Sequence, residues 1–365
     1  MKHWYEFEGI EKIDSPALIV YKDRVKENIE ILKSMVDSIS RLRPHVKTHK
    51  MREVTELLIK EGIRKFKCAT IAEAEMVALS GGEDILIAYQ LVGPKIVRYI
   101  DLVQQYPDCR FSSLIDNIDS YKELQLQSSE NNVNVSVYVD LNVGMNRTGT
   151  DIESAKQIYL QGNKELLPIL GFHLYDGHIV EKDLIRREKD CEEAYAPVDK
   201  LVNELVAVGY SPLVVAGGTP TFSFHKKRKN VECSPGTFVF WDRGYQQVCH
   251  EQKFLPAALV LSRVISKPKP GLYCLDLGYK SIASENLLDH RAYFLEHESA
   301  IVKGQSEEHI VIELNEESRP LNIGEIIFAM PFHICPTVAM YDFVYVVTGR
   351  NITEKWEVMA RNRVL

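Results

Sequence analysis

The sequence predicts an α/β protein, with an N-terminal (β/α)8 barrel of the TIM type followed by a mostly antiparallel β domain. From about residue 40 to residue 240, short β-rich runs alternate with segments of helical periodicity, and eight such runs can be counted. After about residue 250, strand-like runs follow one another without helices. The length of 365 residues is enough for roughly two domains.

The eight runs of the first region are spaced like strands that are separated by helices. They are RLRPHVK (41–47), KFKCAT (65–70), DILIAY (84–89), RFSSLI (110–115), NVSVYVDL (134–141), PILGFHLY (168–175), PLVVAG (212–217) and TFVFWD (237–242). Residues 181–209, the longest segment between two runs, carry apolar residues at three- and four-residue spacing among charges, which indicates an amphipathic helix. An open doubly wound sheet would show the same alternation. The count of eight favours the barrel, although the helix after the last run is the least clear.

The second region reads as a series of strands. Its runs are AALVLSRVI (257–265), LYCLDLG (272–278), RAYFLE (291–296), HIVIEL (309–314), IGEIIFAM (323–330), FVYVVTG (343–349) and EKWEVMA (354–360). The segment SPALIVYKD (15–23) can add a strand to this domain before the first helix, DRVKENIEILKSM. We expect the barrel to span residues 21–250 and the β domain to span residues 251–365 together with the strand 15–20.

Composition excludes several classes of protein. Hydrophobic residues make up 45% and charged residues 26%, as in globular proteins and unlike disordered or fibrous ones. The net charge is −7 and there is no long basic stripe, so we expect neither nucleic acid nor a membrane as a partner. The densest basic run, HKKRKN (225–230), is short and typical of a solvated loop.

The cysteines and the N-terminus predict a cytoplasmic protein. Seven cysteines are scattered without a CxxC spacing, which argues against a disulfide framework and for a reducing compartment. The first residues, MKHWYEFEGIEKID, lack the apolar core of a secretory signal. The longest apolar runs are far too short to span a membrane.

In a barrel, functional residues are expected at the carboxyl ends of the strands, and chemistry-bearing residues do fall there. Around the last two strands, Gly217-Gly218-Thr219 and Gly236-Thr237 offer exposed backbone N–H groups where such barrels bind phosphate. Two tight turns would explain either pair alone. Their occurrence together, where the fold predicts an anion site, favours phosphate.

Lys47 is the candidate reactive amine. It lies in RLRPHVKTHK, close to Arg43, His45 and His49, and we expect it to point into the barrel mouth. Neighbouring positive charge and partial burial keep a lysine partly neutral, so that it can form a Schiff base. A surface lysine in a basic loop is the alternative, and Lys50 is a competitor that we expect to be more exposed.

A Schiff-base lysine that faces a phosphate site across a barrel mouth points to pyridoxal phosphate. Arg147, in GMNRTG (144–149), is a candidate partner for the phenolic oxygen of this cofactor. Tyr175, in YDGH (175–178), and His173 are candidates to stack on the ring or to face its nitrogen. A packed histidine in the barrel interior is the alternative for His173.

The last cluster is PFHICPTV (331–338) in the β domain. One residue separates His333 from Cys335, so on a strand their side chains would share a face. Imidazole and thiolate are good zinc ligands, and two protein ligands leave positions open, as a Lewis-acid site requires. As an isolated pattern HxC is weak, and a pair of buried residues would also explain it.

Together these motifs resemble the D-threonine aldolase and D-serine dehydratase family of fold-type III, alanine-racemase-like pyridoxal phosphate enzymes. The resemblance rests on RPHVKTHK, NVGMNRTG, YDGH, GGTPTF, PGTFVFWD and HICPTV, and it runs over nearly the whole chain. It implies a barrel with a C-terminal β domain and, usually, a homodimer.

The resemblance also assigns roles to residues. Lys47 would form the Schiff base, Arg147 would lie near the phenolic oxygen and Tyr175 near the ring nitrogen. Gly218, Thr219, Gly236 and Thr237 would hold the phosphate. His333 and Cys335 would hold a divalent metal, zinc or manganese; family dehydratases use His and Cys for zinc, whereas some aldolases have His and Asp and prefer manganese-like ions. The CPTV context of Cys335 also resembles bacterial aldolases, so the pair leaves the reaction open.

The resemblance implies a lyase acting on D-β-hydroxy amino acids. We favour cleavage of D-threonine to glycine and acetaldehyde. Dehydration of D-serine or D-threo-3-hydroxyaspartate to a keto acid and ammonia is the first alternative. An amino-acid racemase is the second, although a racemase needs a second base and no metal. A non-catalytic pyridoxal phosphate carrier would resemble the barrel alone, and residues 250–365 argue against it.

Overall fold

The computed structural model describes residues 3–162 and 167–364, which form two compact units. The barrel unit comprises Leu32–Lys47, Arg52–Gly236 and the residues from Asn362 onward. The β unit comprises the N-terminal residues through Ile31, Thr48–Met51 and Thr237–Arg361. Within the described ranges, no helix combines the length and the apolar character that crossing a bilayer requires.

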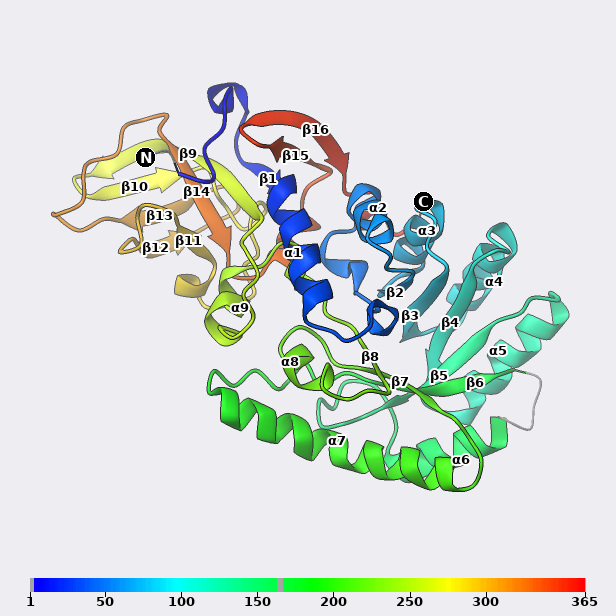
Figure 1. Ribbon diagram of the computed structural model, residues 1–365. Helices are drawn as coiled ribbons and strands as arrows, with labels where there is room; N and C mark the ends of the chain where they lie inside the picture. The colour runs from blue at the N-terminus through cyan, green and yellow to red at the C-terminus, as the bar shows by residue number, and fades with distance from the viewer. Residues whose placement is uncertain (1–2, 163–166, 365) are drawn as a thin grey trace. The chain divides into compact units, whose positions relative to one another are not determined.

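The barrel unit is built on a parallel sheet, to which the described residues contribute seven strands in the order β2 to β8. The strands are β2 (Lys65–Cys68), β3 (Asp84–Gln90), β4 (Arg110–Ile115), β5 (Ser136–Leu141), β6 (Ile169–Leu174), β7 (Leu213–Ala216) and β8 (Val231–Cys233). Its helices are α2 (Arg52–Lys60), α3 (Ile71–Leu79), α4 (Pro94–Gln105), α5 (Ile118–Glu130), α6 (Ile152–Gly162), α7 (Leu184–Ala207) and α8 (Phe222–His225). The helices from α3 to α7 lie on the outer side of the sheet, as parallel crossover connections require (Figure 1). The predicted alternation and fold class are therefore confirmed.

The first predicted run, 41–47, is not a regular strand, although it occupies the position of one. Residues Leu42 and His45 form isolated parallel bridges, to Cys233 on β8 and to Lys67 on β2. Pro44 has no N–H to donate, and its carbonyl accepts the N–H of Lys67 at 2.9 Å. The chain then turns into the 3-10 helix η3 (Val46–Thr48). This irregular segment joins the two outer strands of the sheet and closes the barrel.

The eighth predicted run, 237–242, is also not a strand. Thr237–Val239 form a 3-10 helix, Trp241 has a left-handed φ of 48°, and all six residues are buried in the β unit. A short buried apolar run cannot be distinguished from a strand by composition. The last strand of the sheet is instead Val231–Cys233, which directly follows the basic run and was not predicted.

The interior of the barrel carries the residues that lead to the candidate site. Leu86, Leu114, Tyr138 and Val215 form one buried cluster from four strands. Alternate residues of a strand share a face, so Asp140 extends this interior face towards the carboxyl end of β5.

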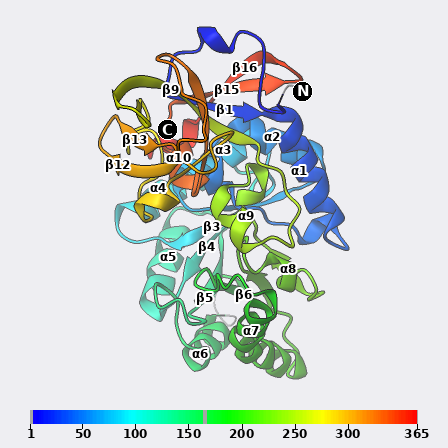
Figure 2. The same ribbon diagram turned by 90° about the vertical axis from the view of Figure 1, so that its left-hand side faces the viewer.

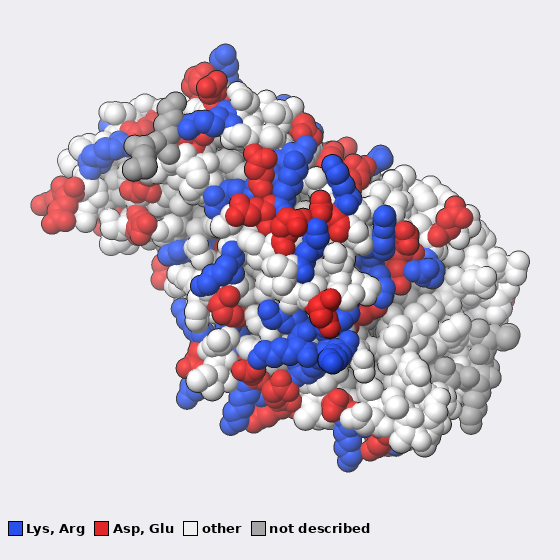
Figure 3. Space-filling model, viewed as in Figure 1, with Lys and Arg blue, Asp and Glu red and all other residues white. Residues whose placement is uncertain are grey.

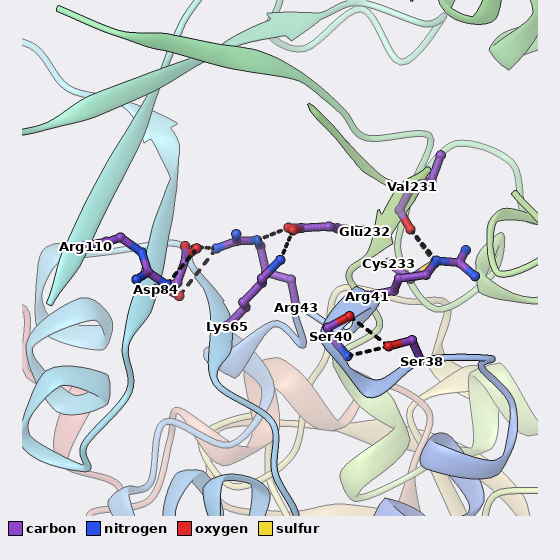
Figure 4. Close-up of polar contacts among 10 residues, drawn as sticks. All are labelled: Ser38, Ser40, Arg41, Arg43, Lys65, Asp84, Arg110, Val231, Glu232 and Cys233. Carbon is purple, nitrogen blue, oxygen red and sulfur yellow. Dashed lines mark hydrogen bonds and ion pairs between the residues drawn. The ribbon is translucent and has the colours of Figure 1, made fainter. Parts of the chain in front are cut away.

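A buried ionic network lies near the amino ends of the strands (Figure 4). The guanidinium of Arg43, only 1% exposed, lies between Glu232 on β8 and Asp84 on β3, at 2.7 Å and 2.6 Å. Lys65 on β2 also pairs with Glu232. The network therefore connects the closing segment to three strands by charge.

The β unit contains a mostly antiparallel sheet, which confirms the predicted second region. Its strands are β1 (Ala17–Tyr21), β9 (Ala258–Lys269), β10 (Leu272–Leu275), β11 (Ala292–Phe294), β12 (Ile301–Gln305), β13 (Ile310–Glu313), β14 (Ile326–Pro331), β15 (Phe343–Thr348) and β16 (Asn351–Glu357). As predicted, β1 joins this sheet, antiparallel to β9 and parallel to β15, and β15 and β16 form a hairpin beside it (Figure 2). Strand β12 was not predicted. Helix α1 (Lys22–Ser34) follows β1, and the short helices α9 (Arg243–Val248) and α10 (Ile334–Val338) complete the fold around this sheet.

The basic run 225–230 begins at the last residue of α8, and two of its four Lys and Arg side chains form ion pairs. Lys and Arg side chains gather over α8 and the loop after it, with acidic side chains beside them (Figure 3). Lys227 and Arg228 pair with Glu188 and Glu192 of α7, at 2.5 Å and 2.6 Å. His225 is not solvated, because it is fully buried against Asp176.

Candidate active site

Three cationic side chains that are far apart in the sequence gather around the ring of Tyr175, which directly follows β6. Lys47 Nζ lies 5.9 Å from the ring centroid, and Arg147 Cζ lies 5.0 Å from it. Lys67 Nζ lies 5.6 Å from the same centroid. Cations at these distances are attracted to the face of an aromatic ring. The structure thus brings together three predicted site residues, Lys47, Arg147 and Tyr175, and adds a fourth that was not predicted.

The glycine-rich loop after β7 packs closely against Tyr175. A Cβ at Gly218 would lie 2.9 Å from Tyr175 Cε2, too close for any larger residue unless the ring moves. Gly217 has a φ of +72°, a conformation that favours glycine. The two predicted phosphate loops also meet, because the N–H of Gly236 donates to Thr219 Oγ1 at 3.4 Å.

Thr237, the remaining predicted phosphate residue, is the first residue of the C-terminal segment of the β unit. Its hydroxyl lies 3.8 Å from Cys335 Sγ, within that unit. The predicted phosphate role of Thr237 therefore stays a prediction.

His173, on β6, is buried and held in one orientation by Asp140. Its Nδ1 lies 2.7 Å from Asp140 Oδ1, while its Nε2 has no hydrogen-bond partner among the described residues. Burial and the nearby charge of Lys67 lower the pKa of His173 below its usual value, despite the opposing effect of Asp140. The imidazole is therefore neutral near pH 7. In the neutral ring, Nδ1 keeps its proton and donates a hydrogen bond to the Asp140 carboxylate. Nε2 therefore carries a lone pair.

The structure surrounds Lys47 with other cations than the sequence predicts. Arg43 is neutralised in the buried network at the opposite ends of the strands. His49 belongs to the β unit, where burial lowers its pKa to about 3 and leaves it uncharged. The cations that surround the same ring as Lys47 are Lys67 and Arg147, which only the fold brings close.

Lys67 is the residue that sequence reasoning missed. It lies inside the β-rich run KFKCAT and becomes the third residue of β2, with 3% of its surface exposed. A lysine within a buried strand is unusual, because burying an ammonium group without a partner is unfavourable. That anomaly was the available signal in the sequence.

His333 and Cys335 do not lie on a strand, contrary to the prediction. Strand β14 ends at Pro331; His333 is the N-cap residue of α10, and Cys335 lies in its first turn. Pro336 follows Cys335 and cannot continue the ladder of a sheet, which is consistent with the turn into a helix. The two side chains nevertheless meet, because His333 is hydrogen bonded to Cys335.

Two acidic residues support this pair and were not predicted. Glu285 accepts a hydrogen bond from His333 Nδ1. Asp242 is buried and accepts the backbone N–H of Ile334 at 3.0 Å. Burial lowers the pKa of His333, but Cys335, Asp242 and Glu285 outweigh this effect and raise it to about 9. A cation bound to this imidazole would displace its proton.

A second group of metal-type donors lies in the barrel unit. Ligand atoms of Asp176, Cys191 and His225 lie within 4.8 Å of one another, and all three residues are buried. Asp176 already binds His225 Nε2 and Thr221 Oγ1, each at 2.7 Å. Burial raises the pKa of Cys191 to about 12, so it remains a thiol. These groups satisfy one another and hold the loop that carries Tyr175.

Buried polar atoms without partners test whether the barrel unit fits pyridoxal phosphate. Lys67 Nζ, His173 Nε2 and Ser234 Oγ have no hydrogen-bond partner among the described residues. Each is at or near the carboxyl end of its strand, and buried polar atoms are rarely left unpaired. The cations around Tyr175 and the glycine loops fit an anionic, aromatic cofactor. In the β unit, the imidazole, thiol and carboxylate groups fit a divalent metal such as zinc.

Two known protein families match separate parts of the chain. Residues 20–243 match the family described as "Alanine racemase, N-terminal domain". Residues 257–347 match the family described as "Putative serine dehydratase domain".

Individual relatives are similar over almost the whole chain. D-threonine aldolase from Arthrobacter sp is 24% identical over 358 residues, covering 96% of this chain and 93% of the relative. 3-Hydroxy-D-aspartate aldolase from Paracoccus denitrificans (strain Pd 1222) is 24% identical over 371 residues, with the same coverage. The crystal structure of D-threonine aldolase from Filomicrobium marinum superposes with a TM-score of 0.87 at 25% identity, covering 97% of both chains.

Proposed function

This chain belongs to the alanine racemase N-terminal domain family, within the group of D-threonine aldolases and D-serine dehydratases, and on that premise we propose that it is a lyase of D-β-hydroxy amino acids that uses pyridoxal phosphate and a divalent metal. The preferred reaction in this proposal is cleavage of D-threonine to glycine and acetaldehyde. In that reaction the Cα–Cβ bond breaks and the β-hydroxyl loses its proton.

One observation carries the proposal: Lys47 and Arg147 meet around the ring of Tyr175 although they come from separate parts of the sequence. A primary amine, a guanidinium that is always charged and an aromatic ring together suit a phosphorylated aromatic aldehyde. In the proposal Lys47 is the attachment point, and Gly218, Thr219, Gly236 and Thr237 bind the phosphate.

The cofactor, when bound, supplies an electron sink for negative charge at Cα, and a divalent metal supplies a Lewis acid. In the proposal, Arg147 binds the ring oxygen and Tyr175 faces the ring nitrogen. His173 holds a proton at Nδ1 through Asp140 and presents an uncharged Nε2. His333 and Cys335 hold the metal, and Glu285 fixes the orientation of the His333 ring.

Dehydration of D-serine or D-threo-3-hydroxyaspartate is the second candidate, supported by the match of residues 257–347 to the serine dehydratase domain. The relatives named above are aldolases, and none is a racemase. We therefore do not pursue the racemase alternative.

Product analysis distinguishes the two reactions. The purified protein, supplied with pyridoxal phosphate and zinc or manganese, is incubated with D-threonine. We expect acetaldehyde and glycine in equal amounts; 2-oxobutyrate and ammonia would instead identify a dehydratase. L-threonine serves as the stereochemical control. Absence of turnover of D-threonine, D-serine and D-threo-3-hydroxyaspartate would refute the proposal.

The attachment point is tested by absorbance. We expect a band at about 420 nm when the protein binds pyridoxal phosphate. The band should disappear in Lys47→Ala and remain in Lys50→Ala. A protein that stays colourless in the presence of the cofactor would refute the cofactor claim.

The proposal includes assembly and location. We propose a homodimer, as is usual in the family, which sedimentation would detect as a particle of twice the 41.7 kDa chain mass. The location that we propose is the cytoplasm, because the seven cysteines are scattered in the sequence without a CxxC spacing.

A further inference from the structure

Lys67 is a buried lysine whose amine has no hydrogen-bond partner in the part of the chain that the structure describes. It lies on β2, two residues after Lys65, so the two lysines share the inner face of the strand. Lys65 has an acidic partner in Glu232, whereas Lys67 Nζ has no partner among the described residues. An unpaired ammonium group in a buried position is unfavourable, so its presence calls for a function.

Two cations and two carboxylates act on Lys67, but neither carboxylate is hydrogen bonded to it. Lys47 and Arg147 lie around the same Tyr175 ring. The two carboxylates that act on Lys67, Asp140 and Asp176, are already bound by other groups. Asp140 is engaged by His173, Gln90 and Thr148, at 2.7 Å, 2.8 Å and 2.9 Å. Asp176 is engaged by His225 and Thr221.

These contacts affect the protonation of Lys67 in a definite direction. Burial, and then the positive charge of Lys47, lower its pKa to about 7; Asp140 and Asp176 act in the opposite direction and Arg147 adds to the lowering. The neighbouring His173 is uncharged and therefore adds no further positive charge beside Lys67. Near pH 7 the amine is therefore only partly protonated. An anion brought beside it would raise its pKa again and draw a proton onto Nζ.

We propose that Lys67 is a cofactor-binding residue, whose ammonium group binds an anionic oxygen of pyridoxal phosphate. This inference rests on the proposed function and adds a residue to it. The ring oxygen and the phosphate of the cofactor are both anionic and would both satisfy Lys67. In either case Lys67 is distinct from Lys47, because it contributes a charge and a hydrogen bond rather than a covalent attachment.

The test uses 4′-deoxypyridoxine 5′-phosphate, which keeps the ring oxygen and the phosphate but has no aldehyde to react with a lysine. Calorimetry gives its dissociation constant for the wild type, for Lys67→Met and for the control Lys182→Met, which removes an exposed lysine from the barrel unit. Loss of a charged hydrogen bond should weaken binding about 10- to 100-fold in Lys67→Met. Binding by Lys182→Met should be unchanged.

A second measurement counts protons and begins with the wild type, so its first result does not depend on how the variant folds. Binding to the wild type at pH 8, repeated in buffers of different ionisation enthalpy, gives the number of protons exchanged. Lys67 is mostly neutral at that pH, so binding should take up a proton, and the uptake should decline towards pH 6, where Lys67 is already charged. Lys67→Met should lack this uptake. A lysine with a merely structural role would not produce it.

The outcomes separate this inference from the proposed function. Equal affinity and equal proton uptake in wild type and Lys67→Met would overturn the role of Lys67 and leave the proposed function intact. Failure of the wild type to bind the analogue would overturn the proposed cofactor as well. Binding of inorganic phosphate identifies the oxygen. If Lys67→Met weakens the binding of phosphate as much as the binding of the analogue, Lys67 contacts the phosphate group. If the substitution weakens only the binding of the analogue, Lys67 contacts the ring oxygen.

Discussion

The ring of Tyr175 lies against Gly218, and this contact requires the absence of a side chain at that position. A Cβ at Gly218 would approach Tyr175 Cε2 to 2.9 Å, so Gly218→Ala must displace the ring. Overpacking of this kind costs about 1–3 kcal/mol. We expect the dissociation constant for pyridoxal phosphate, measured by absorbance titration, to rise about tenfold or more.

Gly304→Ala is the matched control for this substitution. A Cβ at Gly304, on β12, would meet no atom within 4 Å, so the variant should bind the cofactor like the wild type. If Gly218→Ala also bound it with unchanged affinity, the packing of Tyr175 would not determine cofactor binding.

His49 should make the protein sensitive to acid. Burial lowers its pKa to about 3, whereas the unfolded chain has the ordinary value of about 6.5. Between these values the unfolded state binds the additional proton, so stability decreases as the pH falls below about 6.5. His49→Asn keeps an acceptor for the N–H of Met51 and removes the titrating group.

Thermal unfolding at pH 6.5 and 4.5 tests this expectation. The decrease in melting temperature should be smaller in His49→Asn than in the wild type, corresponding to a difference on the order of 2 kcal/mol. The exposed His309, replaced by Asn, is the control and should behave like the wild type. Identical acid sensitivity of all three proteins would contradict the assignment.

At the scale of secondary structure, β8 is held to its neighbours by charge. Glu232, in the middle of this three-residue strand, binds both Arg43 and Lys65 (Figure 4). Glu232→Gln would remove one of the two carboxylates that pair with the buried guanidinium of Arg43. We expect this loss to lower the free energy of unfolding by about 3–5 kcal/mol. The melting temperature should fall by several degrees.

Glu188→Gln provides the comparison for the same chemical change. Glu188 pairs with Lys227 on the surface of the barrel unit, and exposed pairs contribute about 0–1 kcal/mol. Its melting temperature should remain close to that of the wild type. An equal effect of the two substitutions would mean that burial does not strengthen the Glu232 network.

At the scale of the whole molecule, the proposed cofactor and metal residues are divided between the two units. Lys47, Arg147 and Tyr175 belong to the barrel unit, whereas Thr237, one of the proposed phosphate residues, belongs with His333 and Cys335 to the β unit. Lys47, the proposed attachment point, is not among the proposed metal ligands, so removal of the metal should abolish cleavage but leave the cofactor bound. Treatment with a chelator should eliminate product formation while the absorbance at about 420 nm persists.

Cys335→Ala tests, without a chelator, whether the cofactor stays bound when the metal is lost. Its metal content, measured by elemental analysis, should fall close to zero while the cofactor absorbance is retained. Cys274→Ala, at a partly exposed cysteine on β10, should keep both. Loss of the cofactor together with the metal in Cys335→Ala would contradict the prediction that cofactor binding does not require the metal.

The sequence determined much of the fold, because hydrophobic periodicity depends on local geometry. It placed six strands of the barrel, the long amphipathic helix α7 and the joining of β1 to the β domain correctly. It failed where local pattern and tertiary role diverge. The run 237–242 is as apolar as a strand, but it begins with a buried 3-10 helix. The segment 42–45, which closes the barrel, is irregular because Pro44 has no N–H to donate.

The candidate site divides in the same way. Motifs in the sequence identified Lys47, Arg147, Tyr175 and the HxC pair, because each belongs to a recognisable local pattern. Glu285 and Asp242 carry no such pattern and acquire meaning only from their neighbours in space, and Lys67 is marked in the sequence only by its position inside a β-rich run. Charge and burial depend on distances between residues that are far apart in the chain, so only the tertiary structure could show that Lys67 shares the Tyr175 ring with Lys47 and that Arg43 does not.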